Sequence, residues 1–274
     1  MVLATSGVAC FGRVDGDKDL ISSSSGGSSS GGSSSGASSS GGSSSGASSS
    51  GSSGASSGGS GVAAGCPGDI VDGEGHTYRT MLVGGACWMA DNLDVGTRVQ
   101  GTADQKNDGR IEKYCFGDRD ESCAVNGGLY QLGEATAYDT RERVQGICPN
   151  GWHIPSDAEW TALEVALGCA DPNNQPYQSG SDEEYRCEGL GWEGSKLGGL
   201  VDKLPGHRHY ASHEKGWGDR DEGSATMFWT STRIDVPYAA GDEYAIRRRL
   251  DKGNKKVSRY SYSQLGYSVR CVRN

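Results

Sequence analysis

One segment of the chain carries a strong helical pattern. The letters SDAE at residues 156–159 form a capping box, in which the serine hydroxyl and the glutamate carboxylate each accept a hydrogen bond from a backbone N–H. Trp160, Leu163 and Leu167 follow at the spacing of one helix face, and Gly168 is typical of a helix end. The pattern predicts a helix that begins at this box and ends at Gly168.

Strand-like patterns dominate the C-terminal third. Short runs rich in β-branched and aromatic residues, bounded by turn residues, predict strands in MFWTSTR, EYAIRRRL, KVSRYSYS and GYSVRCV. The letters DKGN at residues 251–254 predict the turn between the second and third of these strands.

The N-terminal half of the domain gives weaker signals. The turn letters DGEG at residues 72–75 predict a β-hairpin between residues 70–71 and 78–83. Apolar residues recur at helical spacing within GGLYQLGEATAYD, at Leu129, Leu132 and Ala135. We therefore predict an α+β fold with two helices and many short strands.

A low-complexity stretch divides the chain. Residues 22–61 contain only serine, glycine and alanine, so they offer no apolar side chain to offset the entropy of ordering. We expect a flexible tether at residues 22–65. It joins an N-terminal segment, residues 1–21, to one folded domain, residues 66–274.

The charge balance excludes some partners. The net charge of −9 argues against binding to nucleic acid or to an acidic membrane surface. No apolar run approaches the roughly 20 residues that cross a bilayer. The acidic run at residues 14–20 lacks the glycine and the distal glutamate of a calcium loop, and we expect no metal or other cofactor.

Cys10 resembles the lipidated cysteine of a bacterial lipoprotein. Ala9 suits the position before such a cysteine, although Gly7 stands where leucine is usual and no basic residue precedes the short apolar region. We favour lipidation of Cys10, which implies export to the outer membrane or cell surface and membrane attachment through the lipid only. The alternatives are an ordinary N-terminus with a spare thiol, and a periplasmic or secreted protein.

The remaining cysteines predict disulfides. Of the nine cysteines, Cys10 precedes the tether and eight follow it, an even set that favours four disulfides and an oxidising compartment. A zinc site is disfavoured because no CxxC pair occurs. Cys169 and Cys187 enclose a polar, turn-rich insertion that a local disulfide would restrain.

Five blocks together carry a family resemblance over residues 69–274. In chain order they are DGEGHTYRTMLVGGACWMADNL, GGLYQLGEAT, CPNGWHIPSDAEWTAL, FWTSTR and GYSVRCVRN. The series resembles the Fibrobacter succinogenes major paralogous domain, a family found in exported bacterial proteins. The resemblance implies a C-type-lectin-like fold, with two helices, a twisted antiparallel sheet and long loops, distantly related to formylglycine-generating enzymes. The resemblance also implies the disulfide Cys148–Cys271. Cys66–Cys87 and Cys169–Cys187 are then expected as local pairs particular to this chain, and Cys115–Cys123 as a pair across a short loop.

The functional motifs of these relatives are absent. The loop NQPY at residues 174–177 and the strand letters WTS at 229–231 lack the oxygen ligands with which C-type lectins bind calcium and sugar. The reactive cysteine pair of the formylglycine-generating enzymes is also missing, because the resemblance already assigns Cys271 to a disulfide. We therefore expect no catalysis. The alternative is an unrecognised enzyme that uses a histidine-rich loop, His207, His209 and His213, whereas the simpler interpretation of that loop is a solvated turn.

We expect a binding module for a surface carbohydrate or a protein. Aromatic side chains in loops or at sheet edges are suited to stacking on sugar rings or anchoring a protein. The basic hairpin at residues 247–259 is suited to an acidic polymer, or is a charged solvent face that discourages aggregation. The candidate ligand-binding residues are Trp192, Tyr210, Trp217, Tyr244, Arg247 and Arg249.

The segment CPNGWHIPSDAEW, residues 148–160, superficially suggests an active site. Its glutamate closes the capping box, and Asp157 in the first helical turn complements the helix dipole. We predict that Cys148 forms a disulfide, Trp160 anchors the core and His153 packs or hydrogen-bonds locally. The segment is therefore interpreted as a structural joint.

Overall fold

The structure is a computed structural model, and it describes residues 65–172, 184–192, 197, 201–210, 217–235 and 243–274. All of them belong to one compact unit, Gly59–Asn274. Cys10, the predicted tether before residue 65, His213 and the NQPY loop lie outside the described residues. The side chains of Tyr210 and Trp217 also lie outside them.

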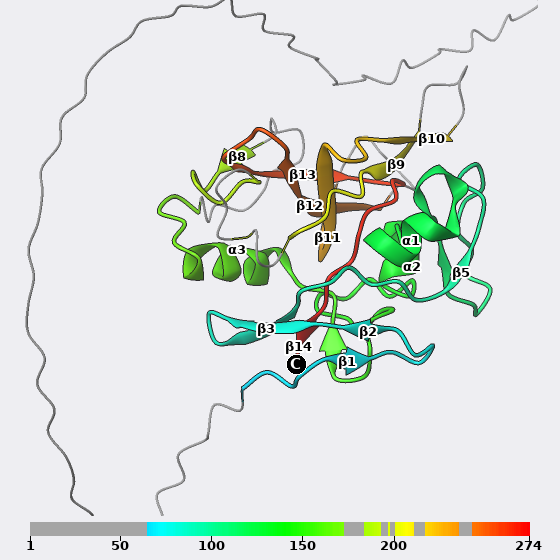
Figure 1. Cartoon of the computed structure of the whole chain (residues 1–274), viewed down its shortest axis with the longest axis horizontal. Coiled ribbons are helices and arrows are strands. Elements are labelled where there is room, and N and C mark those ends of the chain that lie inside the picture. The colour runs from blue at the N-terminus through cyan, green and yellow to red at the C-terminus, as the bar shows by residue number, and fades with distance from the viewer. Residues whose placement is uncertain (1–64, 173–183, 193–196, 198–200, 211–216, 236–242) are drawn as a thin grey trace, which may run out of the picture. The chain divides into compact units, whose positions relative to one another are not determined.

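The described part of the chain combines short strands with a few short helices (Figure 1). Its strands are β1 (Ile70–Val71), β2 (Thr77–Tyr78), β3 (Thr80–Val83), β4 (Ala86–Met89), β5 (Thr97–Arg98), β6 (Glu112–Lys113), β7 (Trp152–His153), β8 (Glu184–Arg186), β9 (His207–Tyr210), β10 (Trp217–Arg220), β11 (Ala225–Ile234), β12 (Tyr244–Asp251), β13 (Val257–Tyr262) and β14 (Val272–Arg273). Its helices are η1 (Phe116–Asp118, a 3-10 turn), α1 (Asp120–Asn126), α2 (Leu132–Ala135) and α3 (Asp157–Ala166).

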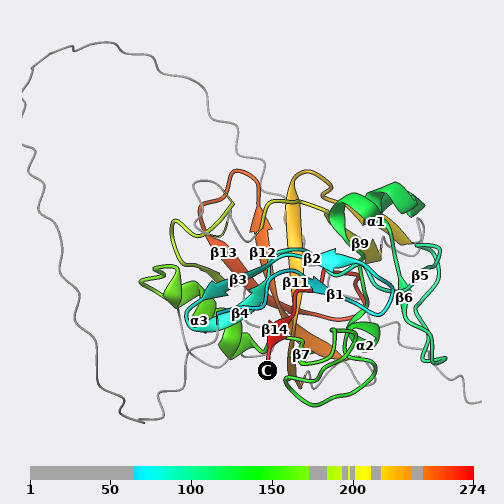
Figure 2. The same ribbon diagram turned by 60° about the horizontal axis from the view of Figure 1, so that its bottom comes forward.

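Two four-stranded antiparallel sheets organise the fold (Figures 1 and 2). One has the strand order β3-β4-β14-β7 and the other β11-β12-β13-β8. Two-stranded antiparallel sheets form from β1–β2 and from β9–β10, whereas β5 and β6 pair in parallel. The fold is therefore mixed α and β, built mostly from small antiparallel sheets rather than from one continuous sheet.

The predicted capping-box helix is confirmed as α3. The Glu159 amide donates to Ser156 Oγ at 3.2 Å, and the Ser156 amide donates to Glu159 Oε2 at 2.9 Å. Trp160 and Leu163 are buried. The helix ends at Ala166, and Gly168 follows with a φ of +99°, because left-handed backbone there is easiest for glycine.

Other elements differ from the prediction. The helix α1 was not predicted, because a seven-residue segment without a side-chain cap gives no helical pattern in the sequence. The disulfide Cys115–Cys123 anchors this helix to η1. The helix α2 is shorter than predicted, since Leu129 pairs with Tyr114 as an isolated β-bridge. The predicted hairpin forms as β1–β2, but its second strand breaks before Thr80, where β3 begins.

The segment GYSVRCV forms a strand only at its end, in β14. The preceding residues are buried and hydrogen-bond to several parts of the chain instead of to one partner strand. Backbone hydrogen bonds run from the amides of Tyr267, Ser268, Leu93 and Met89 to the carbonyls of Tyr130, Met227, Val269 and Cys271 respectively, all between 2.9 and 3.0 Å. This segment therefore holds the two sheets and α2 together.

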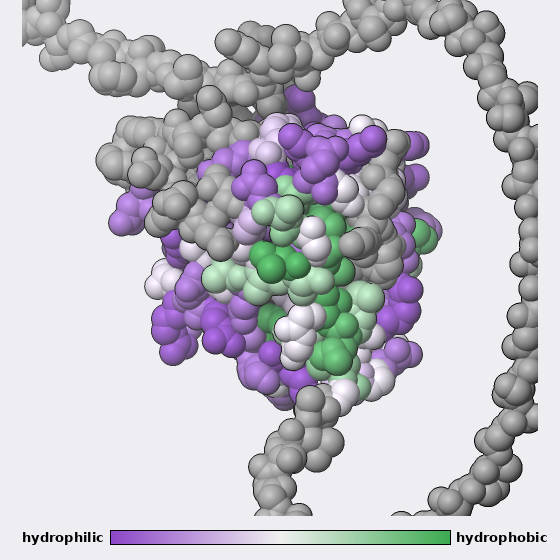
Figure 3. Space-filling view, turned by 90° about the vertical axis from the view of Figure 1, so that its left-hand side faces the viewer, coloured by the Kyte–Doolittle hydropathy of each residue, from purple (hydrophilic) through white to green (hydrophobic). Residues whose placement is uncertain are grey.

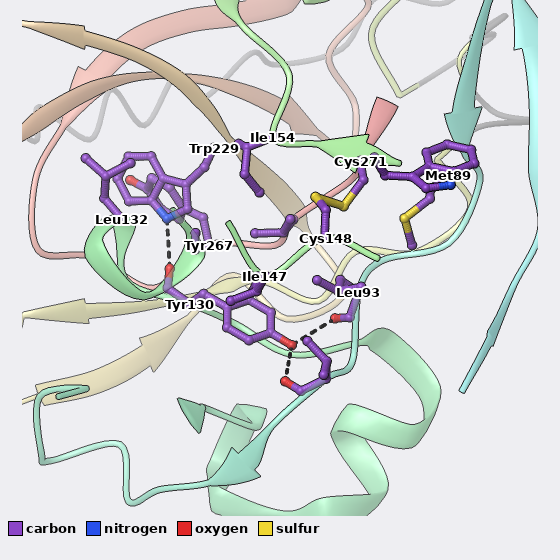
Figure 4. Packing of buried hydrophobic residues seen from close by; sticks show 14 of the residues in the cluster. Met89, Leu93, Tyr130, Leu132, Ile147, Cys148, Ile154, Trp229, Tyr267 and Cys271 are labelled. Carbon is purple, nitrogen blue, oxygen red and sulfur yellow. Dashed lines mark hydrogen bonds between the residues drawn. A yellow bond between two sulfur atoms is a disulfide. The ribbon is translucent and has the colours of Figure 1, made fainter. Parts of the chain in front are cut away.

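The core has two clusters on opposite faces of β11. Trp229 faces the first cluster, where its indole Nε1 donates to the Tyr130 carbonyl at 2.8 Å and its ring lies 4.4 Å from that of Tyr267 (Figure 4). Phe228 faces the second cluster, 5.3 Å from the ring of Trp160 on α3. Neighbouring residues of a strand point to opposite faces, so one strand supports both clusters.

The four disulfides join the predicted cysteine pairs, of which Cys148–Cys271 was implied by the resemblance and the other three were predicted as local pairs. They are Cys66–Cys87, Cys115–Cys123, Cys148–Cys271 and Cys169–Cys187. Cys148–Cys271 spans 123 residues and lies within the first core cluster (Figure 4). It fixes the segment before β7 to the segment before β14.

Apolar side chains gather on the face that carries α3 and β3 (Figure 3). Leu82 of β3 and Val165 of α3 are both about half exposed. The two elements are in close contact here, because a Cβ placed on Gly84 would lie only 2.7 Å from the Cβ of Ala166. The turn after β3 therefore requires glycine both for this approach and for its φ of +61°.

Candidate functional site

The basic hairpin is not the charged surface that the sequence suggested. Arg247, Arg248 and Arg259 are at most 2% exposed. Both faces of β12 are covered, with α3 over Arg248 and the tyrosines of β13 over Arg247. The lysines of the following turn remain exposed, but the arginines are not available to an acidic polymer.

Asp157 of α3 binds two of these arginines. Arg248 Nη1 donates to Asp157 Oδ1 at 2.6 Å, and Arg259 donates from Nε at 2.9 Å and from Nη2 at 2.5 Å. Burial by itself would raise the pKa of Asp157, but the two guanidinium groups outweigh it and lower that pKa to about 2. Asp157 thus does more than complement the helix dipole.

Glu164 continues the same network about two turns further along the same side of α3. It is 1% exposed and accepts hydrogen bonds from Arg248 Nε at 2.7 Å and from Arg186 Nη2 at 2.5 Å. Asp157 and Glu164 are seven residues apart, so they project from one side of the helix towards the sheet. Each buried carboxylate here has two guanidinium partners, which makes the network structural.

The other predicted binding residues do not form one surface. Trp192 is partly buried and packs on the second core cluster, so it is not the exposed aromatic that was expected. Arg249 pairs with Asp251 at 2.6 Å and Asp221 at 3.5 Å. Tyr244 is partly buried on the opposite face of β12 from Arg247 and Arg249. Tyr210 and Trp217 are backbone partners in the β9–β10 sheet.

The histidine-rich segment is strand β9 rather than a solvated loop. The His207 side chain is 6% exposed, and its ring lies 5.5 Å from that of His209. Asp221 lies 3.4 Å from His207 Nδ1, yet burial, His209 and neighbouring arginines lower the pKa of His207 to about 2. A histidine with this pKa is neutral near pH 7, so it does not carry the imidazolium proton that a histidine general acid transfers.

His153 occupies the predicted joint. Its Nε2 lies 2.9 Å from Glu159 Oε1, and its Nδ1 lies 2.5 Å from Asn274 Oδ1. Burial would raise the pKa of Glu159, but hydrogen bonds from His153 and from Ser156 lower it. His153 is buried and connects the start of α3 to the C-terminal residue, which is a structural role.

A small cavity with both polar and apolar lining lies beside the start of α2. Its volume is about 200 Å³. Its walls come from the loop between β5 and β6, from α2 and the turn after it, and from the residues that flank the β12–β13 hairpin. The lining residues are Gln105, Gln131, Leu132, Gly133, Glu134, Tyr138, Glu243 and Gln264.

Two glutamines form the rigid part of the wall. Gln105 Oε1 accepts a hydrogen bond from the backbone N–H of Gln131 at 2.7 Å, and Gln131 Oε1 accepts one from the backbone N–H of Gln105 at 2.8 Å. The side-chain nitrogen of Gln105 donates to the carbonyls of Glu112 and Leu129, and that of Gln131 donates to Asp104 at 3.1 Å. The side-chain amide hydrogens of both glutamines are thus engaged within the protein.

Glu134 lies at the buried end of the cavity. It is 3% exposed, and its two oxygens accept from the Glu112 amide and from the Tyr138 hydroxyl, each at 3.0 Å. Burial raises the pKa of Glu134, and the nearby carboxylate of Glu112 adds to this rise. The same burial, together with Glu134, raises the pKa of Tyr138.

The backbone beside Glu134 is strained. Ala137 and Tyr138 have φ values of +48° and +59°, in the left-handed region that non-glycine residues rarely adopt. The turn brings the Tyr138 ring against Gly133, where an added Cβ would lie 2.9 Å from Tyr138 Cε1. Consecutive residues in this conformation are often retained where they position a functional side chain.

Only an indirect signal for this cavity is present in the sequence. Gln131 and Glu134 belong to the block GGLYQLGEAT, which helped to carry the family resemblance. Nothing local connects that block with Gln105 or Gln264, because these residues meet only through long-range packing. Tyr244 was the nearest predicted binding residue, adjacent in sequence to Glu243.

The structure carries no sign of a metal centre in the part that it describes. No group of three or more histidine, cysteine, aspartate or glutamate side chains there could hold a metal ion. The letters WTS in β11 are buried, with Trp229 and Thr230 at 0% exposure, so they do not form a surface site. None of the helices in the described ranges is long and apolar enough to cross a membrane.

Comparison with known proteins identifies the family. The model of the Fibrobacter succinogenes major domain matches residues 81–273, which is most of the chain. The chain therefore belongs to this family, as its sequence blocks indicated. No curated protein and no solved structure shows significant similarity to the chain.

Proposed function

We propose that this protein is an exported, lipid-anchored binding module that holds a C-type-lectin-like domain away from the bacterial surface. Four disulfides are typical of proteins that fold in an oxidising compartment outside the cytoplasm. In this proposal Cys10 is the lipid anchor and the Ser/Gly-rich stretch is the tether. The role is non-catalytic, and the ligand is a carbohydrate.

The cavity beside α2 is the observation that carries this proposal. Ligand sites are concave and contain a few well-placed polar groups. The cavity is smaller than the roughly 300–1,000 Å³ of a drug-sized pocket, which suits a single sugar ring. The oxygens of Glu134 and Gln105 can accept further hydrogen bonds from sugar hydroxyls, and the hydrogen bonds between Gln105 and Gln131 hold the wall in place.

A glycan array probed with the oxidised full chain tests this proposal. The Gly133→Ala variant forces Tyr138 to move within the cavity, and Gly68→Ala is a matched control because nothing lies within 4 Å of its added Cβ. We expect wild type and Gly68→Ala to bind the same glycans, and Gly133→Ala to bind them at least about tenfold more weakly.

Folding and metal dependence are controlled in the same experiment. Thermal unfolding identifies any variant that has lost its fold, and a chelator leaves binding unchanged if no metal takes part. Failure to bind any glycan, or equal binding by Gly133→Ala, would contradict the proposal. Loss of binding with chelator would also contradict it, because it would require a calcium site.

A further inference from the structure

The cavity is lined by a buried carboxylate that has no ion-pair partner in the described residues. This carboxylate is Glu134, which is 3% exposed. Glu112, whose backbone amide donates to Glu134, lies outside the lining, is 6% exposed and likewise forms no ion pair in the described residues. Glu164, at 1% exposure, has two arginine partners instead. Buried carboxylates are costly unless they are paired or protonated, so Glu112 and Glu134 are an exception within this protein.

Cationic side chains near these carboxylates pair with other acidic groups. Arg110, which interacts electrostatically with Glu112, pairs with Asp108 at 2.6 Å. Arg233 pairs with the cavity-lining Glu243 at 2.5 Å and donates to Thr136 Oγ1. Lys113, next to Glu112 in the chain, pairs with Asp94 at 2.8 Å. Nearby Asp108 and Glu112 both raise the pKa of Glu134, which means that the local potential is negative.

We infer that the cavity binds the ammonium group of an amino sugar, with Glu134 as its counter-ion and the hexose ring against the glutamine wall. This inference rests on the proposed function and names the class of its ligand. An ammonium group on the ligand supplies the positive charge that the protein lacks at this point. It also donates to the remaining lone pairs of Glu134, because Glu134 Oε1 and Oε2 each accept only one bond from the protein.

The lining favours an amino sugar over a lysine side chain. A lysine side chain presents one ammonium group on a four-carbon stem and no hydroxyls. Apart from Leu132 and Gly133, the residues that line the described cavity end in amide, carboxylate or hydroxyl groups. A hexosamine presents hydroxyls to such groups and an ammonium to Glu134.

Isothermal titration of the oxidised full chain distinguishes these ligands. Glucosamine, N-acetylglucosamine, glucose and Nα-acetyl-lysine amide are the four probes. Glu134→Gln removes the charge with little change of shape, and Glu121→Gln on the exposed face of α1 is the matched control. We expect glucosamine to bind at least about tenfold more tightly than the two neutral sugars, and Glu134→Gln to abolish that preference.

The outcomes separate this inference from the proposal on which it rests. If glucosamine and N-acetylglucosamine bind equally well, or if Glu134→Gln leaves their binding unchanged, the amine site is overturned. The carbohydrate-binding proposal is retained in either case. Tighter binding of the lysine derivative would overturn it in favour of a protein ligand. Absence of any binding by wild type, here and on the glycan array, would overturn both. A shift of the preference in Glu121→Gln would show that general surface charge, and not Glu134, sets it.

Discussion

Asp157 at the start of α3 and Arg248 in the middle of β12 form a buried ion pair, with 2.6 Å between Oδ1 and Nη1. Ninety-one residues separate them in the chain, yet their contact decides where the helix lies on the sheet. Arg259 of β13 binds the same carboxylate. One side chain of the helix therefore joins two strands.

Asp157→Asn should be strongly destabilising. The substitution leaves the guanidinium groups of Arg248 and Arg259 buried without this countercharge, and breaking a buried pair from one side costs about 3–5 kcal/mol. Urea unfolding of the oxidised protein measures the loss in the free energy of unfolding. Asp69→Asn, at an exposed position, is the control and should change it by less than about 0.5 kcal/mol. Equal effects of the two substitutions would show that the network contributes little.

The same pair should make the protein sensitive to acid. The pKa of Asp157 falls from its ordinary 3.8 to about 2 in the folded state. Because the folded pKa is the lower one, its contribution of about 2 kcal/mol is present above about pH 4 and is lost as the pH falls towards about 2.

Unfolding free energies from about pH 5 to 2 test this acid dependence. The difference between wild type and Asp157→Asn should shrink as the pH falls through this range. A constant difference down to about pH 2 would refute the assignment of the lowered pKa to Asp157.

The disulfides should contribute unequally. Chain entropy predicts about 5 kcal/mol for the 123-residue loop closed by Cys148–Cys271 and about 2.5 kcal/mol for the 8-residue loop closed by Cys115–Cys123. Paired cysteine-to-alanine variants of each bridge, compared by thermal unfolding, should show the larger loss for Cys148–Cys271. A larger loss for the short loop would mean that packing around α1 outweighs loop entropy.

Gly84→Ala should destabilise the turn between β3 and β4 by about 1–3 kcal/mol. Its Cβ would lie 2.7 Å from the Cβ of Ala166. Gly85→Ala is the matched control, since Gly85 also has a positive φ, of +84°, but nothing lies within 4 Å of its Cβ. The excess loss in Gly84→Ala, measured by urea unfolding, reports the contact with α3. Equal losses would leave only the backbone strain that both positions share.

Local patterns were sufficient for several parts of the fold. The helix α3 was predicted at both ends, because a capping box and a terminal glycine act through neighbouring residues. The hairpin strands β12 and β13 were also predicted from local signals. The family and the disulfide Cys148–Cys271 followed from five blocks of sequence, whereas the other three disulfides were predicted as local pairs. The helix α1 had no such signal, because its stability comes from a disulfide and from packing.

The candidate site depends on contacts that no local pattern encodes. The run Arg247–Arg249 resembles a charged surface in sequence, but its environment depends on which elements cover the two faces of β12. Asp157 and Glu164 of α3 cover one face and neutralise Arg248 there. Likewise, Glu134 acquires its raised pKa only because the β5–β6 loop and α2 bury it beside Glu112.

The amino-acid sequence alone therefore determined the ends of α3, which depend on residues close in the chain, and the family, which depends on its sequence blocks. The tertiary structure decided which charges are buried and paired and which are buried without a partner. The physical reason is that the environment of a charge is set by desolvation and by partners within a few ångströms, and those partners come from distant segments.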